Sequence, residues 1–475
     1  MTVPAPHRSR VLVTGATGYV GGRLVPRLLQ HDRRVRVLVR DPMRLGGRGW
    51  ADQVEVVAGD VLRPETLGDA LKGVGVAYYL VHSLARGAGY QERDLAAAAA
   101  FGDAAARAGV ERIIYLGGLG DPEAGLSRHL RSRQETGEAL REGGVPVTEF
   151  RAAVVVGSGS ISFEMIRYLT ERLPVMICPQ WVYTRVQPIA VDDLLTYLVA
   201  ALDVPESAGR VIEIGGSDVL TYGEMMLGYA QARGLTRRLQ PVPVLTPTLS
   251  SYWVHLVTPI PSQMARPLIE GLRNETVVRD RSAHDLFPDV HPCAYATAVQ
   301  AAVAGLDTGE VETTWSDALV TSGGDVEPRV LTTQEGKLIE RRQTVVRATP
   351  AETFAVVRAL GGRRGYRAWD WAWELRGAAD RLVGGVGLRR GRRHPTDVRV
   401  GDALDFWRVE AVDPDRLLRL RAEMKVPGSA WLQFETLPRD DGGTLLVQTA
   451  YFAPRGVPGL AYWYVLLPVH SRIFS

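Results

Sequence analysis

Three glycines near the start of this 475-residue chain have the spacing of a phosphate-binding turn. Gly15, Gly18 and Gly21 lie in the stretch VLVTGATGYVGG, between an apolar run and an amphipathic run. At this spacing the first glycine permits a sharp turn, the second permits the backbone to approach a pyrophosphate, and the third permits close packing of the next helix. The N–H groups and the dipole at the start of that helix favour negative phosphates. The motif therefore predicts a dinucleotide-binding turn.

The last residue of the second predicted strand distinguishes between the two nicotinamide dinucleotides. An acidic side chain there pairs with the free ribose hydroxyls of NAD, whereas an arginine accommodates the additional phosphate of NADP. The strand at 35–40 ends in Arg40, whose planar guanidinium suits a phosphate dianion. NADP is therefore favoured as the cofactor, and NAD is the less favoured alternative.

Polar side chains also follow the fourth predicted strand. His82 and Ser83 come directly after the apolar run at 76–81. Ligands of open α/β sheets bind at the carboxyl ends of the strands. This position therefore predicts that His82 and Ser83 contact the cofactor or the substrate.

These positions depend on an alternating order of strands and helices. Apolar runs typical of buried strands occur at 11–15, 35–40, 54–60, 76–81, 112–117 and 147–157, with helical segments between them. Such alternation indicates an α/β fold with a doubly wound parallel sheet, the Rossmann architecture. Two further strand–helix pairs, at 186–202 and 210–230, are expected to belong to a small substrate-side lobe that extends over about 186–310.

The glycine motif, read as TGxxGxxG, resembles that of the short-chain dehydrogenase/reductase superfamily, especially its extended and atypical (NmrA-like) branches. The resemblance covers roughly residues 10 to 230. It implies that Asp60, in VAGDV, meets the adenine amino group of the cofactor, although an aspartate at this position can instead cap its own loop. The residues predicted to bind the cofactor are Thr14, Gly15, Thr17, Gly18, Tyr19, Val20, Gly21, Arg40, Asp60 and Val61.

The resemblance also locates the catalytic positions, and there the sequence departs from the family pattern. Members that transfer hydride use a Tyr-x-x-x-Lys pair on one helix face and an upstream Ser or Thr. Counting back from the following strand places His129 at the tyrosine position and Arg133 at the lysine position. Gly117 and Gly118 stand where the hydroxyl residue would be. The catalytic candidates are therefore His129, Arg133, His82 and Ser83.

Three interpretations of these replacements remain open. In the first, His129 is an acid–base group with an ordinary pKa near 6.5, and Arg133 anchors the cofactor. The protein is then an NADP-dependent oxidoreductase acting on a small apolar carbonyl or quinone-like substrate. In the second, His129 is a surface or structural histidine and the protein only senses NADP(H), as NmrA-like regulators do. The third interpretation, a nucleotide-sugar epimerase, is suggested by the stretch QPIAVDD at 187–193. Within this stretch Asp192 is expected to cap a helix. An epimerase also needs a proton-transfer pair, so the replaced residues count against this interpretation as well.

The pattern of predicted strands and helices changes after a polar, turn-rich stretch. The predicted organisation is an NAD(P)-binding domain at 8–317, a linker at 318–336 and an α+β domain at 337–475. The last of these resembles an uncharacterised domain that commonly follows such dinucleotide-binding halves in bacteria, and its order of elements resembles the START-like helix-grip fold. That fold implies an apolar ligand cavity lined by aromatic residues, with a plain aromatic core as the alternative. The aromatic segment at 459–468 could contact a membrane surface.

Composition limits the class of protein. The chain is 46% hydrophobic and 23% charged with a net charge of +3, which is typical of a globular protein and argues against a nucleic-acid partner. Its two cysteines and nine histidines show no metal-ligand spacing, so no metal is expected. The start of the chain lacks a signal-peptide core, and no apolar run reaches the ~18 residues of a membrane span. A cytoplasmic protein is therefore expected.

Overall fold

The chain divides into two compact units, residues 1–42 with 49–323 and residues 43–48 with 324–475. The computed structural model describes residues 10–45, 48–82, 90–242, 262–308, 338–362, 392–439 and 442–454, with short pieces at 254, 258, 260, 312–313, 377–378, 380–381, 385, 387 and 462–463. Each unit has its own sheet and its own apolar core.

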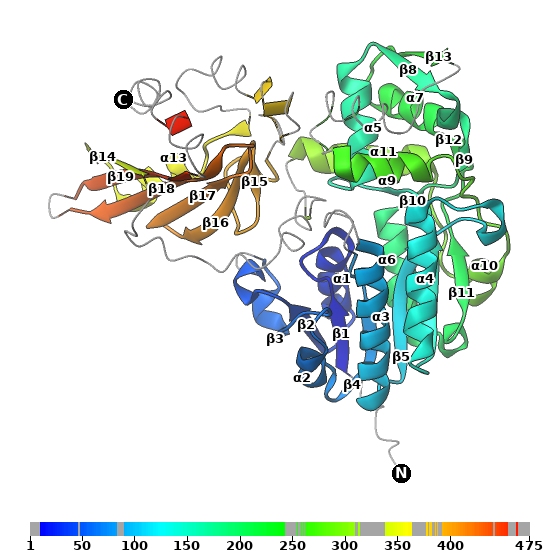
Figure 1. Cartoon of the computed structure of the whole chain (residues 1–475). Coiled ribbons are helices and arrows are strands. Elements are labelled where there is room, and N and C mark those ends of the chain that lie inside the picture. Colours follow the sequence, from blue (N-terminus) through cyan, green and yellow to red (C-terminus); the bar gives the residue numbers. More distant parts are fainter. Residues whose placement is uncertain are drawn as a thin grey trace. The chain divides into compact units, whose positions relative to one another are not determined.

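A seven-stranded parallel sheet forms the centre of the first unit (Figure 1). Its strand order is β11-β6-β5-β4-β1-β2-β3, and every neighbouring pair is parallel. The bounds are Arg10–Thr14 (β1), Val35–Val39 (β2), Glu55–Ala58 (β3), Val74–Tyr79 (β4), Arg112–Gly118 (β5), Val147–Ala152 (β6) and Val211–Ile214 (β11). The order reverses between β1 and β4, where sheets of this kind form their ligand crevice. The predicted doubly wound α/β architecture is confirmed.

Helices cover both faces of this sheet. Tyr78 and Tyr79 are successive residues of β4, so their side chains point to opposite faces. The Tyr79 ring packs on Phe101 of α3 with centroids 5.1 Å apart, while the Tyr78 hydroxyl donates to the Leu198 carbonyl of α6 at 2.7 Å. Helices α2, α3 and α4 share the first face, and α1 packs with α6. The bounds are Tyr19–Gln30 (α1), Leu67–Leu71 (α2), Tyr90–Arg107 (α3), Arg128–Glu142 (α4) and Val191–Ala200 (α6).

Two expectations about the edge of this sheet are wrong. The run at 147–157 is not one strand, because β6 ends at Ala152 and β7 (Val155–Val156) pairs instead with β10 (Ile189–Ala190). The strand expected in the lobe at about 210–214 is β11, which pairs with β6 in the main sheet. Periodicity identifies a strand but not its partner, which depends on the backbone edges that meet in space.

The rest of the first unit is a mainly helical lobe. Helices α5, α7 and α11 share an apolar core that includes Phe163, Met225 and Val299. A second cluster joins α5 to α9 around Met165 and Met264. The helix bounds are Ile161–Arg172 (α5), Tyr222–Ala232 (α7), Ser262–Gly271 (α9) and Tyr295–Thr308 (α11). Two short strand pairs complete the lobe. In the first, β8 (Val175–Pro179) pairs with β13 (Arg238–Val242), and in the second, β9 (Arg185–Val186) pairs with β12 (Leu220–Thr221). Helix α10 (Ser282–Leu286) lies beside β11.

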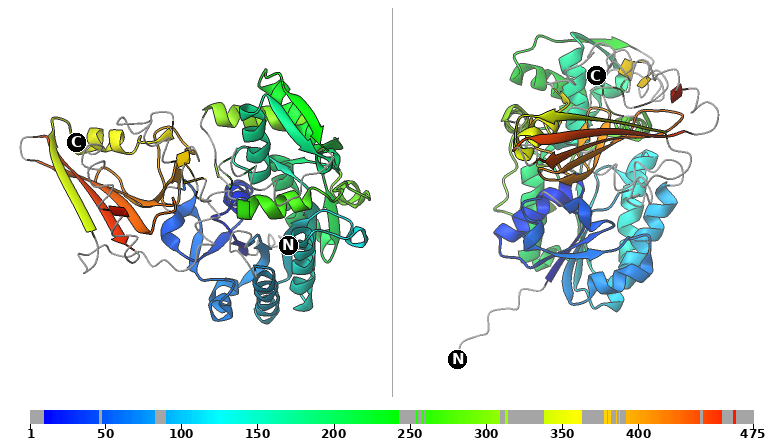
Figure 2. Two further views of the ribbon diagram at one scale, coloured as in Figure 1. Left: turned by 45° about the horizontal axis from the view of Figure 1, so that its top comes forward. Right: turned by 90° about the vertical axis from the view of Figure 1, so that its left-hand side faces the viewer.

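The second unit contains an antiparallel sheet and helix α13 (Pro350–Val357). Its strand order is β14-β19-β18-β17-β16-β15. Helix α13 lies against one face of this sheet (Figure 2). Phe354 and Val357 of α13 belong to the same apolar core as Leu418 and Phe434 of the sheet. The bounds are Leu338–Val346 (β14), Ala403–Leu404 (β15), Trp407–Asp413 (β16), Leu417–Ala422 (β17), Gly428–Pro438 (β18) and Thr444–Pro454 (β19). A separate C-terminal α+β domain is thus present, as predicted.

Some of the described aromatic residues of the second unit pack against one another. Phe406 and Trp407 belong to the core under α13, with ring centroids 5.0 Å apart. Phe452 stacks on Trp463 with centroids 5.6 Å and planes 9° apart. For these residues the packing is that of a plain aromatic core. The terminal helix of a START-like fold, and most of the segment at 459–468, fall outside the described residues, so that fold stays a prediction.

In the part of the chain that the structure describes, no helix combines the length and the apolarity needed to cross a membrane. In the same ranges, no three potential metal-ligating side chains are grouped together.

Candidate functional site

The glycine turn between β1 and α1 has a geometry that requires glycine. Gly15 has a φ of 71°, which residues with side chains rarely adopt, and a Cβ there would lie 2.6 Å from the Leu80 carbonyl oxygen. A Cβ at Gly21 would lie 2.3 Å from the Gly15 oxygen, so glycine is needed for α1 to pack this closely. A Cβ at Gly18 would meet a single atom, the Gly15 oxygen, at 3.2 Å. The space beside Gly18 is therefore open.

The first turn of α1 presents backbone N–H groups at this open space. Gly18 is the N-cap and offers them no side-chain acceptor. Within α1, the first N–H with an intrahelical acceptor is that of Gly22, which donates to the Gly18 carbonyl at 3.0 Å. The first turn has no acidic residue, so the positive end of the helix dipole is not neutralised there. These features fit a bound pyrophosphate.

A small cavity of about 100 Å³ lies on one side of the turn. Thr17, Arg40, Asp60 and Val61 are among the residues that line it. The Asp60 carboxylate accepts the Leu62 N–H at 3.1 Å, so it caps its own loop while it lines the cavity. Both interpretations of Asp60 therefore fit its position.

Thr14 lines the same cavity, but its hydroxyl makes hydrogen bonds to the backbone of the neighbouring strand. That hydroxyl donates to the Tyr78 carbonyl at 3.0 Å and accepts the Leu80 N–H at 3.1 Å. It therefore links β1 to β4 at the point where the strand order reverses. Tyr19 and Val20, the other predicted cofactor residues of the turn, line a second cavity.

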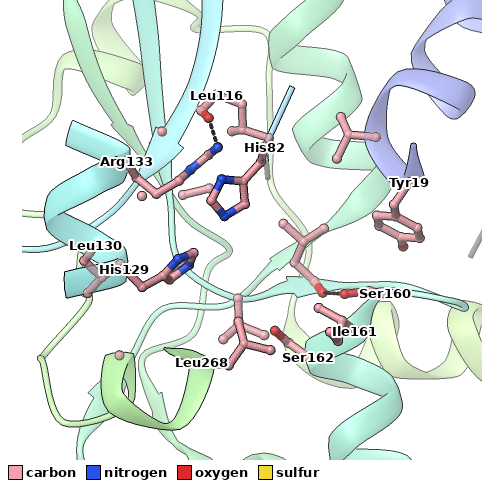
Figure 3. A pocket seen from close by; sticks show the side chains of 18 of the residues that line it. Tyr19, His82, Leu116, His129, Leu130, Arg133, Ser160, Ile161, Ser162 and Leu268 are labelled. Atoms are coloured by element: carbon pink, nitrogen blue, oxygen red, sulfur yellow. Dashed lines mark hydrogen bonds between the residues drawn. The ribbon is translucent and has the colours of Figure 1, made fainter. Parts of the chain in front are cut away.

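This second cavity, of about 350 Å³, also borders the turn, and Figure 3 shows the side chains that line it. It shares Gly15, Gly18 and His82 with the small cavity, so the two are neighbours. Its walls come from the carboxyl ends of β4, β5 and β6, from α4, and from α5 and α9 of the lobe. Together the cavities extend from Arg40 past the glycine turn to His129.

Helix α4 brings His129 and Arg133 to this cavity. Ser127 caps the helix, and its hydroxyl accepts the Leu130 N–H at 3.3 Å. His129 and Arg133 are about one turn apart, so they share a helix face, and both line the cavity. His82 lies on the same wall (Figure 3). Ser83, the remaining catalytic candidate, lies outside the described residues.

Arg133 is held against β5. Its guanidinium donates to the Leu116 carbonyl and lies over the Tyr115 ring, 5.2 Å from the centroid. The Tyr115 hydroxyl donates to the Arg133 carbonyl at 2.7 Å. Burial raises the pKa of Tyr115 to about 12, so this hydroxyl keeps its proton at neutral pH. These contacts fix the first half of α4 to the end of β5.

Two imidazole rings lie next to each other on the cavity wall. The ring centroids of His82 and His129 are 5.3 Å apart. Nδ1 of His82 lies 3.1 Å from a carboxylate oxygen of Asp94 on α3. Nδ1 of His129 is closed off from solvent and has no hydrogen-bond partner among the described residues. The site therefore contains a linked group of titratable side chains.

Burial favours the neutral form of both imidazoles. Burial lowers the pKa of His129 well below its usual 6.5, and the nearby His82 and Arg133 lower it further. Burial also lowers the pKa of His82, although the Asp94 carboxylate opposes this shift. His129 also lies in the first turn of α4, where the helix dipole disfavours a cation. The expected ordinary pKa of His129 is therefore wrong, because the sequence does not show desolvation.

Gly117 and Gly118, the last two residues of β5, leave little room for the Ser or Thr of the family pattern. A Cβ at Gly117 would lie 2.9 Å from a Glu149 carboxylate oxygen, and one at Gly118 would lie 3.1 Å from the Leu130 side chain. Glu149 is fully buried, and Arg151 donates to it at 2.6 Å. Glycine at these two positions, in place of a hydroxyl residue, thus allows β5, β6 and α4 to pack this closely.

The lobe contributes an apolar wall to the cavity (Figure 3). Its apolar lining residues are Ile161, Met165, Met264, Leu268 and Leu272. Methionine side chains are flexible and adapt to irregular apolar ligands. Ser160, at the edge of this wall, donates its hydroxyl to the Val155 carbonyl at 2.7 Å, so it does not replace the missing family serine.

Sequence reasoning did not identify two parts of this site. One is Asp94, which is 6% exposed. A signal for it exists, because Asp94 precedes Ala97 and Ala98 on the buried stripe of α3, where an acidic residue is unusual. The other part is the wall formed by Met165 and Met264, for which no local signal exists, since they lie far apart in the sequence.

Asp192 is not the helix cap that was expected. The N-cap of α6 is Ala190, and Asp192 lies in the first turn of the helix. Its carboxylate accepts a hydrogen bond from the Arg27 guanidinium at 2.9 Å. The neighbouring Asp193 accepts the Cys293 N–H at 2.8 Å. Both carboxylates therefore join elements of the fold.

The parallel sheet, the glycine turn and the adjoining crevice define a Rossmann-type dinucleotide-binding protein. Residues 15–148 match a family described as NAD(P)H-binding. Residues 333–475 match a protein family of unknown function (DUF2867). The nature of the second unit is therefore not specified by its family.

Two relatives of this chain are reductases. It is 33% identical over 243 residues to the ceramide reductase of Caulobacter vibrioides, covering 50% of this chain and 74% of the relative. It is 30% identical over 237 residues to the (4-alkanoyl-5-oxo-2,5-dihydrofuran-3-yl)methyl phosphate reductase of Streptomyces griseus, covering 48% of this chain and 76% of the relative. The chain therefore belongs to the family of these NAD(P)H-binding reductases, within the atypical (NmrA-like) short-chain dehydrogenases/reductases.

Solved structures share the fold of the Rossmann domain. The triphenylmethane reductase of a Citrobacter species aligns with a TM-score of 0.52 and 20% identity, covering 62% of this chain and 99% of that chain. A nucleoside-diphosphate-sugar epimerase of Staphylococcus aureus aligns with a TM-score of 0.51 and 17% identity, covering 61% and 99%. At these identities the likeness concerns the fold alone.

Proposed function

We propose that the protein is an NADP(H)-dependent reductase of a small apolar carbonyl compound or quinone. The observation that carries the proposal is the cavity of about 350 Å³ beside the glycine turn, which has polar groups on one wall and apolar side chains on another. A concave, mainly apolar site with a few convergent polar groups is the usual form of a small-molecule site. The relationship to two reductases supports the same class of reaction.

NADP is the cofactor that suits the crevice best. The glycine turn and the first N–H groups of α1 would hold the pyrophosphate. Arg40 lines the small cavity beside the turn, where a guanidinium would pair with a 2′-phosphate. Asp60 in the same cavity would meet the adenine. When bound, the dinucleotide supplies the hydride, and the chain supplies binding, orientation and proton handling.

The lobe would recognise the apolar part of the substrate. Met165, Met264 and Leu268 line the cavity from α5 and α9. They would remove apolar surface from water and exclude water from the reacting atoms.

His129 is the residue that we assign to the substrate oxygen. As a neutral imidazole it donates an N–H hydrogen bond, which polarises the carbonyl and stabilises the charge that develops on oxygen. Arg133 lies one helical turn away on the same wall, and its positive charge favours the same change. His129 as a neutral hydrogen-bond donor and Arg133 as a fixed cation would thus fill the roles of the family's Tyr-x-x-x-Lys pair.

The proposal is tested by following NADPH oxidation with a panel of apolar aldehydes, ketones and quinones. The parent protein should reduce members of the panel, and His129→Gln should lower the turnover by about a hundredfold or more while NADPH affinity persists. The matched control is His284→Gln, because the His284 side chain is 66% exposed and outside the cavity lining. Unchanged turnover in His129→Gln would remove His129 from the chemistry.

A dinucleotide sensor is the second candidate. The observation that favours it is the tight packing at Gly117 and Gly118, which replaces the hydroxyl residue of catalytic family members. In a sensor, calorimetry would detect NADPH binding while no member of the panel is reduced. That outcome would replace the reductase proposal.

A further inference from the structure

We propose that the lobe binds a second carbonyl oxygen of the substrate through the hydroxyl groups of Ser162, Tyr222 and Thr276. The substrate would then carry two carbonyl groups, as a quinone or an oxo ester does, of which one is reduced and the other is held. This inference rests on the proposed reductase function and narrows its substrate class.

Two of these residues are almost completely buried in the wall of the larger cavity. Tyr222 is 8% exposed and Thr276 is 7% exposed, and both line the cavity of about 350 Å³. Neither hydroxyl has a hydrogen-bond partner in the part of the chain that the structure describes. A buried hydroxyl without a partner is costly, and such groups nearly always have one in folded proteins. A ligand in the cavity would supply the partner.

The backbone holds both residues in fixed positions. The Thr276 N–H donates to the Arg185 carbonyl at 3.1 Å, and the Thr276 carbonyl accepts the Gln187 N–H at 2.9 Å. Tyr222 is the first residue of α7, whose N-cap Thr221 takes part in a capping box. The main chain is thus satisfied by the fold, and the side-chain hydroxyls are left for a ligand. Groups that are held in place before binding lose little freedom when the ligand arrives.

The start of α5 adds further donors to the cavity. Ser160, Ile161 and Ser162 line it, and Figure 3 shows Ser162 on α5, apart from His129 on α4. The Ser162 hydroxyl has no hydrogen-bond partner among the described residues, and the N-cap Ser160 makes no side-chain capping bond. Within α5, the first N–H with a helical acceptor is that of Glu164, which donates to the Ser160 carbonyl at 2.8 Å. The N–H groups before it are available to a ligand.

These groups together require an acceptor on the ligand. Backbone N–H groups only donate, and hydroxyl groups can also donate. Burial raises the pKa of Tyr222, so its phenol keeps the proton that it donates.

The acceptor should be uncharged. None of the described lobe residues that line the cavity carries a charge. The first turn of α5 already contains the carboxylate of Glu164, which is paired with Arg167 at 2.7 Å. A ligand carboxylate would find no free cation on this wall, so a neutral carbonyl oxygen suits it best.

The two sets of polar groups in the cavity come from different elements. His129 and Arg133 lie on α4, whereas the hydroxyl groups come from α5, from α7 and from the segment that follows α9. A compound with one carbonyl group can satisfy only one of the two sets. A compound with two carbonyl groups can satisfy both, while Met165 and Leu268 contact its apolar part. The second oxygen would therefore orient the carbonyl that is reduced.

The first test compares substrates with and without the second carbonyl group. Ethyl 3-oxohexanoate and 4-nonanone have the same chain length, and only the ester has a second carbonyl oxygen. Thr276→Val and Tyr222→Phe remove a hydroxyl and keep the shape of the side chain. Each should lower the ratio of the two kcat/KM values, ester to ketone, by about tenfold in the NADPH oxidation assay.

Matched controls and a second pair of compounds complete this test. Thr236→Val and Tyr183→Phe should keep the parent's ratio, because both side chains are exposed and lie outside the cavity lining. The pair 1,4-naphthoquinone and 1-tetralone is measured in the same way. The pair whose ratio falls further shows whether the second oxygen belongs to a quinone or to an oxo ester.

The second test does not depend on turnover. In the free protein, Thr276→Val should not lower the melting temperature, because its hydroxyl has no partner to lose. NADP+ cannot donate a hydride, so ethyl 3-oxohexanoate added with NADP+ remains unreduced. The ester should then raise the melting temperature of the parent more than that of Thr276→Val. If Tyr222→Phe does not fold, Thr276→Val and Ser162→Ala still decide the matter.

The outcomes separate this inference from the proposed function. If the parent reduces the compounds and the variants keep its ratio, the second oxygen is not recognised and the reductase stands. If the variants lose NADPH affinity, the hydroxyl groups belong to the cofactor site and the inference is overturned. If the parent reduces nothing but Thr276→Val loses the stabilisation by the ester, the reductase fails and recognition of the oxygen stands. If the parent shows neither reduction nor stabilisation, both fail.

Discussion

Tyr115 and Arg133 hold each other in place at the cavity. The Tyr115 hydroxyl donates to the Arg133 carbonyl at 2.7 Å, and the Arg133 guanidinium lies over the Tyr115 ring. The contact fastens α4 to β5 within one turn of His129. The cavity wall that contains His129 and Arg133 therefore depends on a residue that is not itself among those lining the cavity.

Tyr115→Phe tests the strength of this attachment. The substitution removes the hydrogen bond and keeps the ring, so the free energy of unfolding should fall by about 1 kcal/mol. Urea unfolding followed by far-UV circular dichroism measures this change. Tyr183→Phe is the control, because Tyr183 is 43% exposed, and it should leave the stability unchanged. Equal stability of the parent and Tyr115→Phe would mean that the bond contributes nothing.

Arg40 should distinguish NADPH from NADH. Calorimetry of the parent should show tighter binding of NADPH, because in the proposed site the guanidinium would pair with the 2′-phosphate. Arg40→Ala should weaken NADPH binding by about tenfold or more and leave NADH affinity nearly unchanged. Arg40→Lys keeps the charge without the planar fork, so it should fall between the two. Equal affinities in the parent would remove Arg40 from cofactor selection.

Substitutions at Gly18 and Gly21 should have different effects, the first on dinucleotide affinity and the second on the stability of the fold. A side chain at Gly18 would project into open space beside both cavities, so Gly18→Val should weaken NADPH and NADH alike with little loss of stability. Gly21→Ala would place its Cβ 2.3 Å from the Gly15 oxygen, so α1 must move and the melting temperature should fall. Thermal unfolding and dinucleotide titration of both variants check this. A Gly18→Val protein with parental affinity would show that no phosphate approaches this turn.

The neutral state of His129 predicts a pH dependence of stability. Its pKa is lowered in the folded protein, so the unfolded chain binds the proton first as the pH falls. The contribution is fully present above the unfolded pKa of about 6.5 and is lost as the pH falls toward the folded pKa. His129→Gln should therefore lose less stability than the parent between about pH 7 and pH 5. Parallel urea-unfolding curves for the two proteins over that range would contradict the lowered pKa.

The Rossmann sheet and the glycine turn could be predicted from the sequence because their signals are local. A strand that is buried on both faces carries a continuous apolar run, as β4 does at Val74–Tyr79. The spacing of Gly15, Gly18 and Gly21 reflects contacts within one turn and one helix. The placement of His129 and Arg133 on one face of α4 follows in the same way from the helical repeat.

Tertiary structure decided what the separated segments do together. The partner of β11, the neighbouring rings of His82 and His129, and the contact of Asp94 with His82 all join residues from different elements. Desolvation is likewise a property of the folded site, so the sequence did not reveal that the pKa of His129 is lowered. A residue's type and its local period are written in the sequence, whereas its neighbours and its dielectric surroundings exist only once the chain has packed.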